Sequence, residues 1–131
     1  MMLSDVRDYV ELLHLSEHTY MGKLDSKQEK SIGVYHGKRE SPYKKAIGGS
    51  SLQSYGIKSV SFLVHWNKSP RDTEKASKAL FEALAESREK SVNNNVTIKF
   101  IQLLCDEPID VGTDENGIYE MVIEAAIVYE R

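Results

Sequence analysis

The sequence predicts an α+β fold, in which two helices pack on one face of a mainly antiparallel β-sheet and a β-hairpin arm projects from it. Two stretches carry apolar residues at helical spacing, and three others alternate between apolar and polar residues as half-buried strands do. A glycine- and lysine-rich stretch, residues 19–56, separates the first helix from these strands. A chain of 131 residues has the usual size of one domain, so residues 1–131 are expected to share a single core.

The first predicted helix starts near the N-terminus. Ser4 is expected to be its N-cap, and Asp5 favours the positive end of the helix. Val6, Tyr9 and Val10 then recur at helical spacing. This apolar stripe is expected to pack onto the sheet.

Residues 19–56 are expected to form an extended arm that projects outward. Glycines interrupt short β-like pieces, and the basic cluster of Lys38, Arg39, Lys44 and Lys45 is poor core material. Such a segment is unstable alone, but it can be ordered by adding to the edge of a neighbouring sheet.

Residues 57–66 alternate cleanly and predict a strand with one buried face. The residues "SPRD" that follow predict a helix start, with Ser69 as N-cap, Pro70 at N1 and Asp72 at N3. An apolar stripe continues to Leu84, while most other positions of this helix are Lys or Glu. The corner "HWNKSPRD" is therefore interpreted as a strand-to-helix junction.

Residues 96–105 and 117–130 predict two further strands. Pro108 stops the first, and the "DENG" before the second carries the Asn-Gly turn pattern. The two strands are expected to pair as an antiparallel hairpin with a long acidic connection. The last strand has apolar residues on both faces, which is typical of a sheet that meets another subunit. The predicted core residues of the whole domain are Val60, Phe62, Val64, Trp66, Leu80, Leu84, Met121, Ile123 and Ile127.

The composition argues against a broad nucleic-acid-binding surface. The formal net charge is -3, whereas binding to duplex DNA draws mainly on Lys and Arg that neutralise phosphates. Cys105 is the single cysteine and cannot close a disulfide within the chain, and no charged-then-apolar leader precedes Ser4, so a cytosolic protein is expected. No stretch approaches the roughly 20 apolar residues of a membrane-spanning helix.

The sequence gives little support for a catalytic or metal-binding site. His14 and His18 would share a helix face if the first helix reached them, but a third zinc ligand is not in evidence. His65 would act as a general base only beside a nucleophile, and acidic neighbours disfavour Cys105 as a nucleophile. The acids of residues 106–116 do not follow the spacing of a calcium-binding loop. No catalytic residue, metal or cofactor is therefore expected.

Two long stretches, "SYGIKSVSFLVHWNKSPRDTEKASKALFEAL" and "FIQLLCDEPIDVGTDENGIYEMVIEAAIVYER", resemble a known family. The chain is similar to the small phage minor capsid proteins of prophages in Gram-positive bacteria, which share length and element order with the tail-terminator proteins of long-tailed phages. The likeness extends over nearly the whole chain and is strongest in "HWNKS", "EPIDVGTDENGIYE" and the closing "YER". These strings carry no chemical signature, so the resemblance implies no catalytic residue.

The resemblance implies a structural role in the virion. A terminator subunit assembles, typically as a hexameric ring, on the head-proximal end of the tail tube and offers a surface to the head-tail connector. The implied partners are further copies of the chain, the tail tube protein and the connector protein. Genomic DNA would pass nearby without specific binding, and the protein would occupy the host cytoplasm only during assembly. A net negative charge suits a channel through which DNA passes without being held.

A subunit of a ring uses two different patches, and the charge pattern suggests which two. The basic arm of one subunit is predicted to contact the acidic connection of the next. The residues of this predicted interface are Lys38, Arg39, Lys44 and Lys45 in the arm and Asp106, Glu107, Asp110, Asp114 and Glu115 in the connection.

The sequence is also compatible with other classes of protein. One alternative is another phage minor capsid or head-tail connector protein, and a second is a small monomeric binding module. An enzyme would need converging titratable groups, which makes the polar partners of His65, besides Ser61, the feature to inspect.

Overall fold

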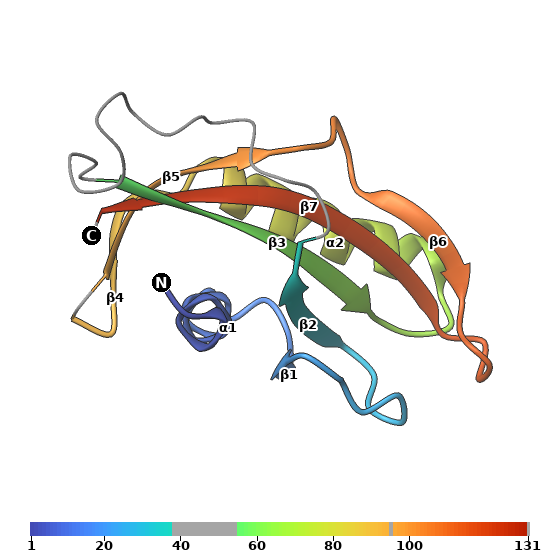
Figure 1. Ribbon diagram of the computed structural model, residues 1–131. Helices are drawn as coiled ribbons and strands as arrows, with labels where there is room; N and C mark the ends of the chain where they lie inside the picture. Colours follow the sequence, from blue (N-terminus) through green and yellow to red (C-terminus); the bar gives the residue numbers. More distant parts are fainter. Residues whose placement is uncertain (38–54, 95, 131) are drawn as a thin grey trace.

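The computed structural model describes residues 1–37, 55–94 and 96–130 (Figure 1). Two helices and seven strands confirm the predicted α+β class. The elements in chain order are α1 (Leu3–Leu12), β1 (His18–Met21), β2 (Ser31–His36), β3 (Tyr55–His65), α2 (Pro70–Ala85), β4 (Arg88–Val92), β5 (Val96–Leu103), β6 (Ile109–Thr113) and β7 (Tyr119–Glu130).

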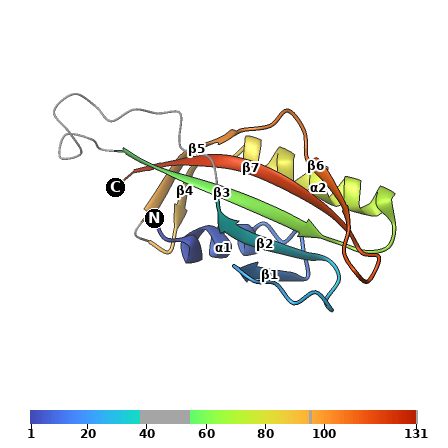
Figure 2. The ribbon, with the colours of Figure 1, turned by 45° about the vertical axis from the view of Figure 1, so that its right-hand side comes forward.

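All seven strands belong to one sheet in the order β1-β2-β3-β7-β5-β4, and β6 pairs with β7 beside β5. Only β1 and β2 are parallel; the other pairs are antiparallel. The long ladder between β3 and β7 runs from the pair Tyr55 and Glu130 to the pair His65 and Glu120. Because α1 contacts β1 and β2 as well as β4, which lie at opposite ends of this order, the sheet is curled around it (Figures 1 and 2).

Both helices contribute to one core on the same face of the sheet. Phe62 of β3 stands opposite Ile123 of β7, and both belong to the buried cluster that contains Val10 of α1 and Leu80 of α2. Amphipathic helices are held in proteins mainly by packing of this kind.

A hydrogen bond links the two helical regions within this core. The Tyr9 hydroxyl of α1 lies 2.6 Å from the hydroxyl of Ser87, just beyond α2. Ser87 is itself 2% exposed, so the pair satisfies two polar groups that would otherwise be costly to bury.

The predicted core residues divide into two groups. Trp66 lies just beyond β3 and is partly buried against the core, while Met121 is partly exposed and stands outside the buried cluster. Met121 lines a groove at this end of the sheet, which explains why it is less covered than its alternation suggests. The others are exposed by 1% or less: Val60, Phe62, Val64, Leu80, Leu84, Ile123 and Ile127.

The two helix starts differ in how well the sequence predicted them. Ser69 is the N-cap of α2, and its hydroxyl accepts the backbone N–H of Asp72 at 3.3 Å, as predicted. The prediction of Ser4 as N-cap of α1 is wrong, because the helix starts at Leu3 and its N-cap lies two residues before Ser4. Met2 is the N-cap residue, and the Asp5 carboxylate accepts the Met2 backbone N–H at 2.9 Å.

The prediction of an arm is wrong for the part of it that forms β2. This strand pairs with β3, and its Ile32 and Val34 are exposed by 1% and 0%. Gly33, which suggested a break, allows close packing instead: a Cβ there would meet the ring of Tyr35 at 2.8 Å. A glycine inside a strand can therefore reflect a neighbour's side chain and not a turn.

The acidic connection of the predicted last hairpin contains a strand. β5 and β7 do pair in antiparallel fashion, as expected, but β6 lies between them in sequence and pairs with the other half of β7. Residues 109–113 are mostly exposed and include a bulge, with Gly112 at a φ of 86°. Ile109 and Val111 alternate with Asp110 and Gly112, but over so few residues that the pattern does not distinguish a strand from a loop. β4, four of whose five residues are exposed, was missed for the same reason.

Candidate functional site

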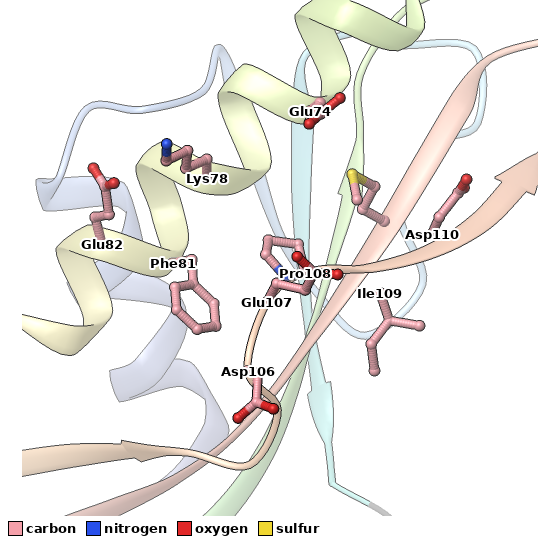
Figure 3. A pocket seen from close by; sticks show the side chains of 10 residues that line it. Glu74, Lys78, Phe81, Glu82, Asp106, Glu107, Pro108, Ile109 and Asp110 are labelled. Atoms are coloured by element: carbon pink, nitrogen blue, oxygen red, sulfur yellow. The ribbon is translucent and has the colours of Figure 1, made fainter.

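A groove of about 790 Å³ lies between α2 and the segment that leads into β6 (Figure 3). Glu74, Lys78 and Glu82 stand four residues apart and so share the face of α2 that lines it. Residues 106–110 form the facing wall. This volume is within the range of small-molecule pockets, but the groove is partly open to solvent, so a chain segment could also occupy it.

The floor of the groove is apolar. Phe81 projects from α2 toward the facing segment (Figure 3), and Pro108, Ile109 and Met121 complete the apolar lining. Ile109 is 40% exposed. Apolar area of this kind, rimmed by charges, is typical of a surface that meets a partner.

The rim of the groove is strongly acidic. Among the described lining residues Lys78 is the only basic one, which leaves a formal charge of -4. Like charges along a low-dielectric wall concentrate the field, so the groove attracts basic segments and repels phosphates. The carboxylates that line it are Glu74, Glu82, Asp106, Glu107 and Asp110.

A second acidic group lies at the end of β3, around a buried histidine. His65 is 0% exposed. Its Nδ1 lies 2.9 Å from Glu120 Oε2, and its Nε2 lies 3.1 Å from the carbonyl oxygen of Ser26. Asp114 Oδ2, 3.8 Å from Nε2, is buried and has no hydrogen-bond partner among the described residues.

Both ring nitrogens of His65 face hydrogen-bond acceptors within the fold. A carbonyl oxygen can only accept, so Nε2 carries a proton that it donates to Ser26. Nδ1, the other ring nitrogen, faces the Glu120 carboxylate. His65 thus has the polar partners that an active site would need, but they bind both nitrogens within the fold. The ring joins β3, β7 and the loop before β2.

The other candidate sites of the sequence are separated by the fold. α1 ends at Leu12, so His14 and His18 do not share a helix face, and His18 instead stacks on Tyr20 with ring centroids 6.2 Å apart. No group of His, Cys, Asp and Glu side chains within the described ranges could hold a metal ion. Cys105 is partly buried beside the carbonyl oxygen of Glu124.

The acidic residues of the predicted interface fall into separate places. Asp106, Glu107 and Asp110 lie together in the groove. Asp114 lies beside His65, and its Oδ1 accepts backbone N–H groups of the turn between β6 and β7. Glu115 is exposed in that turn. The basic residues Lys38, Arg39, Lys44 and Lys45 lie outside the described residues.

Sequence reasoning missed the wall of the groove that α2 provides. The Lys and Glu residues outside its apolar stripe gave no indication of a site on their own, because such residues are ordinary on the outside of a helix. The spacing of Glu74, Phe81 and Glu82, which puts an aromatic ring among acids on one face, was the available indication.

Comparison with known proteins assigns a family. A protein-family model described as "Bacteriophage tail terminator protein" matches residues 9–131. The chain belongs to this family. The matched range contains both walls of the groove and the His65 cluster. No curated protein and no solved structure matches the chain.

This family membership confirms the resemblance to tail terminators that the sequence suggests. Tail terminators are structural components of phage particles, so this member of the family is a virion-associated protein. Within the described ranges, neither helix has the length and apolar character that crossing a membrane requires.

Proposed function

We propose that this protein is a tail terminator subunit that assembles into a ring, with six copies expected, at the head-proximal end of the tail tube and helps to join tail to head. The family match over residues 9–131 carries the proposal. A closed ring needs two different patches on each subunit, one for each neighbour. The acidic groove supplies a candidate for one of them.

The charge of the chain supports a position around a DNA channel. A net charge of -3 gives walls that repel phosphates, so DNA would pass without being held. The proposed partners are further copies of the chain, the tail tube protein and the head-tail connector protein. The proposed locations are the virion and, during assembly, the host cytoplasm. The proposal includes no catalytic step and no cofactor.

Mixing the purified chain with the tail tube protein of the same phage tests this proposal. Negative-stain electron microscopy should show a ring at one end of each tube, and tubes that stop elongating. Tube protein alone, at equal concentration, is the control. Light scattering of the chain at several concentrations then tells whether the ring forms before or only upon contact with the tube.

Two results would contradict the proposal. One is tubes that stay uncapped and keep elongating at saturating amounts of the chain. The other is binding to the connector protein without any binding to tubes, which would favour the alternative of a head-tail connector protein.

A further inference from the structure

The outer edge of β6 is open. Within the described part of the chain β6 pairs with β7 alone. Ile109 and Val111 on this strand are exposed by 40% and 50%. An edge strand with exposed apolar residues is a template on which another strand can pair through its backbone.

The open edge has a definite extent and lies next to the acidic groove. Pro108 has no backbone N–H, which sets one end. At the other end the bulge between Asp110 and Gly112 turns the Gly112 N–H toward Asp110 Oδ1, 2.9 Å away. A short strand therefore fits along residues 109–111, and Ile109 and Asp110 belong to both the edge and the groove.

The charge of the groove indicates what kind of strand would bind. Side chains above this edge meet a rim with a formal charge of -4. Residues 38–45, "KRESPYKK", carry four basic residues and one acidic residue in a chain whose net charge is -3. This segment therefore complements the groove, and such complementarity both speeds encounter and selects the partner.

Both ends of the segment lie away from the groove of the same chain. Gly37 bonds to Ser59 of β3, and Tyr55 pairs with Glu130 at the C-terminal end of β7. The groove instead lies at the level of Met121, which pairs with Val64. At about 3.3 Å per residue, Ser59 and Tyr55 lie roughly 16 and 30 Å from that level along β3. A head-to-tail ring needs a contact from each copy to the next, so we assign the segment to the groove of the neighbouring copy.

We infer that residues 38–45 of one copy add as a short strand to the open edge of β6 in the next copy and place their basic side chains over the acidic groove. This inference rests on the ring assembly proposed above, for which it names the contact. Backbone pairing sets the position of the segment, and the Lys and Arg side chains select the groove.

Hydrogen–deuterium exchange tests the backbone part of the inference. Exchange of peptides covering residues 108–113 is compared between the dilute monomer and rings assembled on tail tube protein. We expect these amides to exchange at least tenfold more slowly in the ring. Unchanged exchange in rings that electron microscopy shows to be intact would overturn the inference while leaving the proposed function standing.

Charge reversal tests the side-chain part. Lys44→Glu with Lys45→Glu, and separately Asp106→Lys with Asp110→Lys, should each weaken ring assembly about tenfold or more at low salt, and less at high salt because of screening. All four changes in one chain should restore assembly, because the opposite charges again face each other. Lys23→Glu with Lys27→Glu, on the exposed loop before β2, is the control for net charge.

The remaining outcomes are also decisive. Failure of the fourfold variant to recover, when its exchange as a monomer shows a native fold, would overturn the inference. Pairing of β6 with β7 already protects part of this strand in the monomer. Further protection in the dilute monomer that is lost when residues 38–45 are replaced by Gly and Ser would show that the segment binds its own groove, which contradicts binding between copies. Absence of rings on tubes for the unmodified chain would instead reject the proposed function.

Discussion

Around His65, Asp114 and Glu120 are largely withdrawn from solvent and face a buried imidazole, whereas Asp106, Glu107 and Asp110 stand on the rim of an open groove. The two sets come from one stretch of chain and consist of the same residue types. They differ in what surrounds them. An acid beside a buried ring must be paired, because an unpaired buried charge is costly. An acid on an open rim stays hydrated and can exchange water for a partner.

This contrast separates the acids that hold the fold from those that are available for assembly. Mutations in the first set are expected to change the free energy of unfolding, and mutations in the second are expected to change assembly alone. Three experiments test this division between the two sets.

The largest effect is expected for His65→Leu. The leucine removes both ring nitrogens and leaves Glu120 Oε2 and the buried Asp114 Oδ2 facing an apolar side chain. We expect the free energy of unfolding to fall by about 3 kcal/mol or more. Urea denaturation followed by the fluorescence of Trp66, the single tryptophan, measures this.

His36→Leu is the matched control for this variant, because His36 is an exposed strand histidine. It should change the free energy of unfolding by about 0.5 kcal/mol or less. A His65→Leu protein as stable as this control would show that the cluster does not stabilise the fold.

Asp8 is intermediate between the acids around His65 and those on the groove rim, because it has defined partners but a side chain that is 37% exposed. The Asn93 amide donates to its carboxylate at 3.0 Å, and Arg7 pairs with it at 2.8 Å. These two interactions, the Asn93 hydrogen bond foremost, hold the pKa of Asp8 below its ordinary value of 3.8. Asn93 also donates to Asp5 and so ties α1 to the turn after β4.

Asn93→Ala is expected to lower the free energy of unfolding by about 1 to 2 kcal/mol at pH 7, since two hydrogen bonds are lost. A lowered folded-state pKa contributes stability above the unfolded-state value, and this contribution is lost as the pH falls through the folded-state value. The difference between variant and wild type should therefore narrow as the pH falls below about 4. Urea denaturation at pH 7 and pH 3 measures it.

Asn94→Ala is the control for the backbone, because Asn93 and Asn94 have similar φ values of 53° and 59°. Both alanines share the cost of the left-handed conformation. A difference between the two variants that is equal at both pH values would contradict the role given to Asp8.

The smallest effect on stability is expected in the groove. Asp106→Asn, Glu107→Gln and Asp110→Asn, combined in one chain, should change the free energy of unfolding by about 0.5 kcal/mol or less. The amide at position 110 keeps an oxygen that can accept the Gly112 N–H. A loss above about 1 kcal/mol in the same urea measurement would place these acids with the buried set.

The sequence could predict elements whose burial is periodic and whose caps are local. The alternation of β3 and the Ser69-Pro70 start of α2 depend on residues a few positions apart, so both were predicted correctly. β2 and β6 could not be recognised in this way. One contains a glycine that packs under a ring, and the other is a short exposed strand.

The candidate site was likewise predicted only in part from the sequence. Asp106, Glu107 and Asp110 were predicted as interface residues from their charge, and they do lie together. Asp114 has the same charge but lies beside His65, which no sequence pattern indicated. The α2 wall was missed because a Glu on a helix has the same sequence signature whether it faces water or a groove.

The fold class, the strand-to-helix junction at Ser69 and the family could all be recognised from the sequence. Helix and strand periodicity, helix capping and family likeness depend on the order of residues along the chain. Which acids are buried and which are exposed to solvent could be seen only in the tertiary structure. Burial depends on residues brought together from distant parts of the chain: Ser26 and Glu120 reach His65 from either side, and α2 meets residues 106–110 across the groove.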